Sequence, residues 1–132
     1  MKFLIGYNGS REAKAALSLA RDHALAFGGA EVFVVSSSGG GTREKPEEIQ
    51  KAEEDLAFAQ EFLKEKGIAC SCHQLARGVT PGEDLVLFAK EHGIDHIYVG
   101  IEKKSRTQKI ILRSNAQYII LKAPCPVITV NR

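Results

Sequence analysis

The chain has 132 residues, 44% of them hydrophobic and 26% charged, which is typical of one globular domain with a buried core. Eighteen Lys and Arg against sixteen Asp and Glu give a formal charge of +2, too small an excess for a dedicated nucleic-acid-binding protein. We find no apolar tract that could span a bilayer and no secretory signal, so we expect a cytoplasmic protein without membrane contact. Its three cysteines are expected to be free thiols.

The first half of the chain alternates strand and helix signals. Residues 3–7 are a short apolar run that predicts a buried strand, and the turn residues 8–10 end it with a helix cap at Ser10. Further along follow a helix over 11–27, a β-branched strand over 31–35, a Ser- and Gly-rich loop over 36–42, and a helix that begins at Pro46 and ends before Gly67. These signals predict two buried strands, each followed by a crossover helix.

The second half continues the alternation. Residues 68–75 predict an edge strand, and Thr80, Pro81 and Glu83 form a capping box for a helix that extends to His92. A strand over 96–100, a helix that opens at Ser114 and a strand over 126–130 complete the chain. Such alternation predicts an α/β fold in which a parallel sheet carries helices on both faces, with a ligand crevice at the carboxyl ends of its strands.

Four segments resemble the universal stress protein family. They are residues 5–10 at the start, the helix entry at 78–81, the strand at 97–100 and residues 123–130 at the end. The resemblance covers nearly the whole chain and implies one domain over residues 1–132. It also implies a three-layer sandwich around a five-stranded parallel sheet of order 3-2-1-4-5, assembled as a homodimer through the last strand, Val127 to Val130.

Many family members bind ATP through three glycines followed by Ser or Thr. Only the first glycine position is kept here, as Gly100, whereas Lys103 and Arg113 occupy the other two and Ser114 holds the hydroxyl position. Glycine at such sites lets backbone N–H groups approach phosphates without a Cβ in the way. The family's usual Asp in the first loop is Asn8 in this chain. The resemblance therefore implies ATP or AMP as a ligand, with a degenerate motif.

Residues 102–113 hold five cations against one carboxylate and lead to the last helix. One interpretation is an anion site in which Lys103 and Arg113 replace the lost backbone cradle, assisted by Ser114 and the helix dipole. The other is a solvated loop with no ligand. Asn8 after the first strand is a candidate ligand contact, and Ser36, with its neighbour Ser37, follows the second strand near the expected base site.

Two further patterns are interpreted as structural. Cys70 and Cys72 lie on one face of a strand beside His73, but the sequence offers no second Cys or His cluster, so we expect strand packing and no structural metal. The chain also lacks recognisable catalytic spacings, and we expect no enzyme. Two hypotheses remain: a regulatory protein that binds an adenine nucleotide or related anion, or a dimeric interaction module that has lost nucleotide and binds a protein partner.

Overall fold

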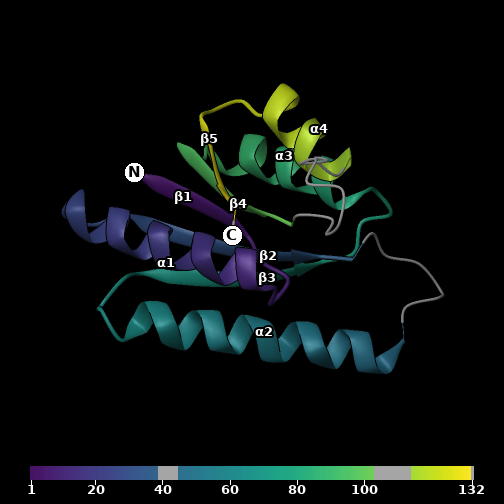
Figure 1. Ribbon diagram of the computed structural model, residues 1–132, viewed down its shortest axis with the longest axis horizontal. Coiled ribbons are helices and arrows are strands. Elements are labelled where there is room, and N and C mark those ends of the chain that lie inside the picture. Colours follow the sequence, from purple (N-terminus) through teal and green to yellow (C-terminus); the bar gives the residue numbers. More distant parts are fainter. Residues whose placement is uncertain (39–44, 103–113, 132) are drawn as a thin grey trace.

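The computed structural model describes residues 1–38, 45–102 and 114–131. Within these ranges five strands and four helices alternate strictly (Figure 1). In chain order they are β1 (Lys2–Gly6), α1 (Arg11–Ala26), β2 (Glu31–Ser37), α2 (Pro46–Lys64), β3 (Cys70–Leu75), α3 (Pro81–His92), β4 (His96–Ile101), α4 (Ser114–Lys122) and β5 (Val127–Asn131). The predicted element order is confirmed.

The strands form one parallel sheet of order β3-β2-β1-β4-β5, as the sequence predicted. β1 lies in the centre, where Leu4 is level with Phe33 of β2 and with Ile97 of β4. The chain winds from β1 toward β3 and then reverses to add β4 and β5 on the other side. This reversal places the carboxyl ends of β2 and β4 on either side of the end of β1, which is where open α/β sheets bind ligands.

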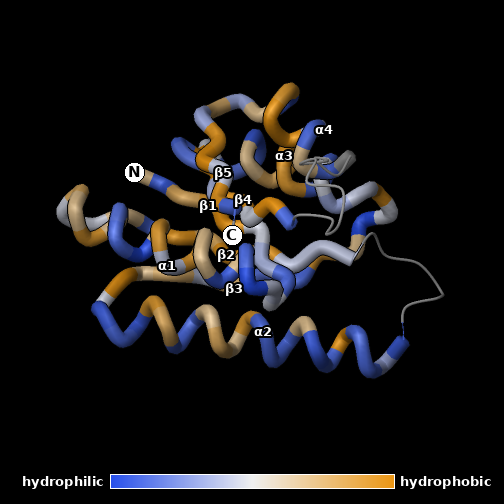
Figure 2. The backbone as a smooth tube through the Cα atoms, in the orientation of Figure 1, coloured by the Kyte–Doolittle hydropathy of each residue, from blue (hydrophilic) through white to orange (hydrophobic). Residues whose placement is uncertain are grey.

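Helices cover both faces of the sheet, with α1 and α2 on one side and α3 and α4 on the other (Figure 1). The apolar residues gather in the strands, whereas hydrophilic residues interrupt α2 along its length (Figure 2). Alternate strand residues feed two separate cores. Val32 and Val34 join the core under α1 and α2, and Phe33 and Val35 join the core under α3 and α4. Each strand of the centre is therefore buried on both faces.

The helix starts follow the predicted caps. Ser10 Oγ accepts a hydrogen bond from the backbone N–H of Ala13 at 3.1 Å, and Thr80 Oγ1 accepts one from Glu83 at 3.3 Å. Gly93 ends α3 in the left-handed conformation, with φ of 62°. Both N-caps were predicted from the residue types alone. The first turns of α1 and α3 that they cap lie at the end of the sheet that holds the cavity.

The strand bounds differ from the sequence prediction by one or two residues, and the largest differences are at the end of β2 and the start of β3. β2 extends two residues further, because Ser36 and Ser37 continue the ladder opposite Gln74 and Leu75 of β3. β3 begins at Cys70 rather than at residue 68. Serine has a low strand propensity, so the neighbouring strand, rather than the local sequence, determines where β2 ends.

Candidate functional site

A cavity of about 230 Å³ opens at the carboxyl ends of β1, β2 and β4. Its walls come from the ends of these strands, the first turn of α1, and the facing sides of α3 and α4. The lining residues are Gly6, Tyr7, Asn8, Ala13, Val35, Ser37, Pro81, Leu85, Val99, Gly100, Ile101, Glu102, Asn115, Ala116 and Ile119. The predicted crevice therefore exists at the winding reversal.

The sheet order gives the cavity two different halves. Val35 and Ser37 at the end of β2, with Pro81 and Leu85 of α3, bound one half, which is apolar apart from the serine. Gly100 and Ile101 of β4, Glu102 after it, and the first turn of α4 bound the other half, which carries more polar groups. An elongated ligand with one apolar and one polar end would fit across the tip of β1.

Asn8 lies in the cavity wall, as predicted. Its Oδ1 accepts a hydrogen bond from the N–H of Ser10 at 3.0 Å, and its Nδ2 donates to Glu102 Oε1 at 3.4 Å. The first contact holds the turn that leads into α1, and the second connects the ends of β1 and β4. Asn8 thus holds the loop geometry of the cavity wall.

Gly100 also lines the cavity, and it has a second constraint that the sequence did not indicate. A Cβ at this position would collide with the backbone of Glu12 and Ala13 in the first turn of α1. Because backbone atoms cannot rotate away as a side-chain tip can, glycine here permits α1 to approach β4 closely. Gly100 therefore contributes to packing between α1 and the sheet.

The two serines that end β2 lie on opposite faces of the sheet. Ser36 is not among the residues that line the cavity, whereas Ser37 is. Side chains alternate along a strand, so Ser37 shares the face of Val35 under α3, and Ser36 shares the opposite face with Val34. The prediction chose Ser36 because it ended the strand two residues early and left both serines in a loop.

The basic segment predicted as an anion site lies outside the described residues. Lys103 and Arg113 belong to residues 103–113, so their placement stays a prediction. Ser114 is the first residue of α4, and the next two residues, Asn115 and Ala116, line the cavity. The amino terminus of α4 therefore adjoins the polar half of the cavity.

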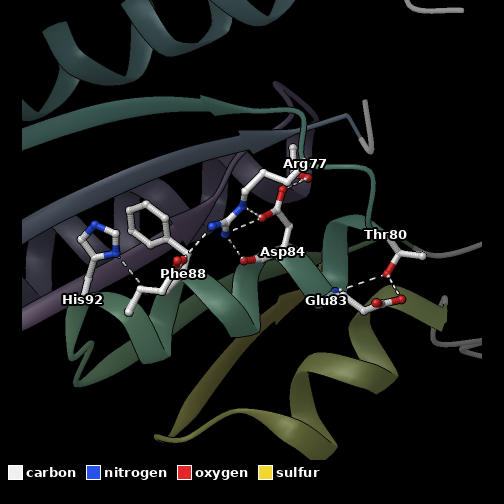
Figure 3. A network of polar contacts seen from close by, with 8 residues as sticks. Arg77, Thr80, Glu83, Asp84, Phe88 and His92 are labelled. Atoms are coloured by element: carbon white, nitrogen blue, oxygen red, sulfur yellow. Dashed lines mark hydrogen bonds and ion pairs between the residues drawn. The ribbon is translucent and has the colours of Figure 1, made fainter. Parts of the chain in front are cut away.

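A charge network around the buried Asp84 borders the cavity and was missed by the sequence analysis (Figure 3). Asp84 lies in the first turn of α3, and its Oδ1 accepts a hydrogen bond from Nε of Arg77 at 2.6 Å. Nη2 of Arg77 forms an ion pair with the same oxygen at 2.6 Å and donates a hydrogen bond to the backbone carbonyl of Asp84 at 3.3 Å. Arg77 Nη1 also pairs with Glu91 at 2.7 Å, and these contacts, with Glu91 first, raise the pKa of Arg77. Ser37 Oγ donates to the other oxygen of Asp84 at 2.8 Å.

Local sequence patterns carry little signal for this network. Asp84 looks like an acidic residue in a first helical turn, a position that is favourable and usually exposed. Its burial depends on the loop that brings Arg77 back over α3 and on the extension of β2 to Ser37. Both features are tertiary, so periodicity along α3 could not show them.

The cysteines of β3 pack as expected of strand residues. Cys70 and Cys72 contact the core under α2, and Cys72 Sγ lies 3.6 Å from the carbonyl oxygen of Leu56. Burial, with a smaller effect of Cys70, raises the pKa of Cys72 to about 11, which keeps its thiol protonated and unreactive. Within residues 1–38, 45–102 and 114–131 there is no group of three or more His, Cys, Asp or Glu that could hold a metal ion.

These features define a doubly wound α/β protein with a ligand crevice at its winding reversal. The family model of the universal stress protein family matches residues 1–131, so the chain belongs to that family. Along the ranges that the structure describes, no helix is long and apolar enough to cross a bilayer.

Relatives of known structure agree with the fold. A universal stress protein from Archaeoglobus fulgidus is 37% identical, with a TM-score of 0.85 over 98% of this chain and 96% of that one. A universal stress protein from the same organism in complex with dAMP is 32% identical, with a TM-score of 0.75 over 98% and 94% of the two chains. A universal stress protein of Methanocaldococcus jannaschii is 30% identical over 90 residues, which is 68% of this chain and about half, 48%, of that protein.

Proposed function

We propose that the protein is a universal stress-type regulatory protein that binds an adenine nucleotide, ATP or AMP, or a related anionic ligand in the cavity. One observation carries the proposal: a cavity of about 230 Å³ lies at the strand ends of a chain that is 32% identical to a protein solved in complex with dAMP. The two unlike halves of the cavity support a ligand with an apolar base and a polar phosphate end. We propose a binding role without catalysis.

The phosphate end is assigned to the half beside α4. Asn115 and Ala116 in the first turn of α4 line this half, where the helix dipole and backbone N–H groups favour an anion. Five cations of residues 102–113 precede α4 in the sequence, and the proposal includes Lys103, Arg113 and Ser114 among the phosphate contacts. We then assign the base of the ligand to the apolar half formed by Val35 and Leu85.

Calorimetric titration of the purified chain with AMP, ATP and inorganic phosphate tests this function. We expect both nucleotides to bind, and Ala116→Leu to weaken AMP binding at least tenfold because the larger side chain fills part of the cavity. Ala57→Leu is the matched control, since Ala57 is exposed on α2, which contributes no lining residue. Absence of heat with either nucleotide would overturn the proposal.

We also propose a homodimer formed through β5, the assembly expected from the family resemblance. β5 is an edge strand, and α4 before it exposes Ile120 and Leu121, the latter with 78% of its surface accessible. Unpaired backbone groups on an edge strand and an apolar surface nearby both favour association. If nucleotide does not bind, this surface supports the second function, a dimeric interaction module with a protein partner.

A further inference from the structure

Ser37 connects the cavity to the buried charge of Asp84. Its side chain lines the apolar half of the cavity, and its Oγ lies 2.8 Å from Asp84 Oδ2. Among the described residues that bound this half, Val35, Pro81, Leu85 and Ser37, only Ser37 has a side chain that offers a polar atom. Whether the Ser37 oxygen donates or accepts a hydrogen bond therefore affects which rings can bind in this half of the cavity.

Asp84 determines which partner in this hydrogen bond gives the proton. Nε of Arg77 donates a hydrogen bond to the Asp84 carboxylate and Nη2 forms an ion pair with it, and a guanidinium stays charged at any physiological pH, so the buried carboxylate is charge-compensated. A carboxylate has no proton to donate. The hydroxyl of Ser37 must donate its only proton to Asp84, and two lone pairs remain on its oxygen.

We infer that Ser37 acts as an acceptor-only group and selects ligands that present an N–H donor to the apolar half of the cavity. For the proposed adenine nucleotide, on which this inference rests, the donor is the exocyclic amine of the base. A base without this donor would leave the Ser37 oxygen unpaired and desolvated, which lowers affinity even though the ring fits. Ser37 is thus a specificity-determining residue, and Asp84 and Arg77 position its proton.

The inference is tested by titrating the full chain with AMP and with purine riboside 5′-monophosphate, which differs only by lacking the 6-amino group. We expect AMP to bind about tenfold more tightly to the unaltered protein. Ser37→Ala removes the acceptor, so the affinity ratio of the two nucleotides should fall to near one, mainly through weaker AMP binding. The ratio is compared within one variant, so a general loss of stability does not imitate this result.

Ser36→Ala is the matched control, because it deletes the neighbouring hydroxyl on the opposite face of β2 and should keep the tenfold ratio. Ser37→Thr keeps a hydroxyl and should restore part of the preference. Equal binding of the two nucleotides to the unaltered protein, or an unchanged ratio in Ser37→Ala, would overturn the inference while the proposed function stands. If neither nucleotide binds at all, the proposed function fails, and the inference that rests on it fails too.

Discussion

His73 lies in a cluster of stacked rings between β3 and α3. Its ring centroid is 5.2 Å from that of Phe88 and 6.1 Å from that of Phe33, and its Nε2 lies 3.1 Å from Ser71 Oγ. The ring of His92 stacks on Phe88 at 3.9 Å and lies 6.2 Å from His73. Burial, and secondly repulsion by His92, lower the pKa of His73. Protonation of this histidine is therefore less favourable in the folded protein than in the unfolded chain.

A pH dependence of stability follows from this depressed pKa. Above pH of about 6.5 both states are neutral at His73, and the stabilisation is fully present. As pH falls through the lowered folded pKa, the unfolded chain takes up the proton more readily, so stability is lost. Urea unfolding at pH 7.5 and pH 5 should show a smaller loss for His73→Gln than for the unaltered protein.

His92→Gln offers a check on the cause. It removes the repulsion but leaves His73 buried, so we expect the acid-induced loss to lie between those of the unaltered protein and His73→Gln. Identical losses in all three proteins would show that carboxylates elsewhere account for the acid sensitivity.

Two glycines at strand ends make the contact between sheet and helices possible, and they differ in what they face. A side chain at Gly100 would meet the backbone of α1, whereas a Cβ at Gly6 would lie 2.8 Å from Leu85 Cδ1, the tip of a flexible side chain. We expect Gly100→Ala to destabilise the fold by about 1–3 kcal/mol, and Gly6→Ala by less, because only the leucine can rotate away. Urea titration of both variants measures the difference.

If Gly6→Ala lowers the free energy of unfolding as much as Gly100→Ala does, the contact between β4 and α1 is not tighter than the contact between β1 and Leu85. The comparison also separates two reasons for a glycine at position 100. A loss of stability in the absence of nucleotide would reflect packing, whereas a phosphate cradle alone would affect binding only.

The elements were predictable to the extent that their signals are local. Ser10 and Thr80 cap their helices because an exposed helix end needs an acceptor whatever lies around it. The end of β2 was not predictable, since two serines join the ladder only because β3 lies alongside. That two-residue error is also why Ser36 was preferred to Ser37 and why the bond to Asp84 was missed.

At the scale of the whole molecule, the sheet has two edge strands, β5 and β3. Successive residues of a strand direct their backbone groups to alternate sides, and Pro126 bonds to β4, so Thr129 of β5 directs its N–H away from the sheet. On β3, Ala69 bonds to β2, and the same alternation directs the N–H of Gln74 outward. Both side chains are exposed.

The proposed dimer predicts different results for proline at these two matched positions. Thr129→Pro removes an outward donor of β5 without breaking its pairing with β4, so sedimentation should change from dimer to monomer. Gln74→Pro makes the equivalent change on the opposite edge and should leave the dimer intact. A monomeric unaltered protein, or equal effects of both variants, would contradict association through β5.

The parallel sheet and the position of the cavity were predictable because alternating strand and helix signals leave few ways to wind such a sheet, whereas the strand order was implied by the family resemblance. Asn8 and Gly100 were found in the cavity wall because strand ends converge there. The Arg77–Asp84 pair could not be found in the same way, since it depends on a loop closing over α3 and carries no periodic signal.

The central position of β1 affects how the chain reaches its native state. β1 is held on one side by β2 but on the other by β4, where Leu4 pairs with Ile97. During translation, one edge of β1 therefore stays without its partner strand until β4 has been synthesised. We expect the apolar residues of β1 to stay accessible for that time, so folding of the sheet is completed long after this strand has been made.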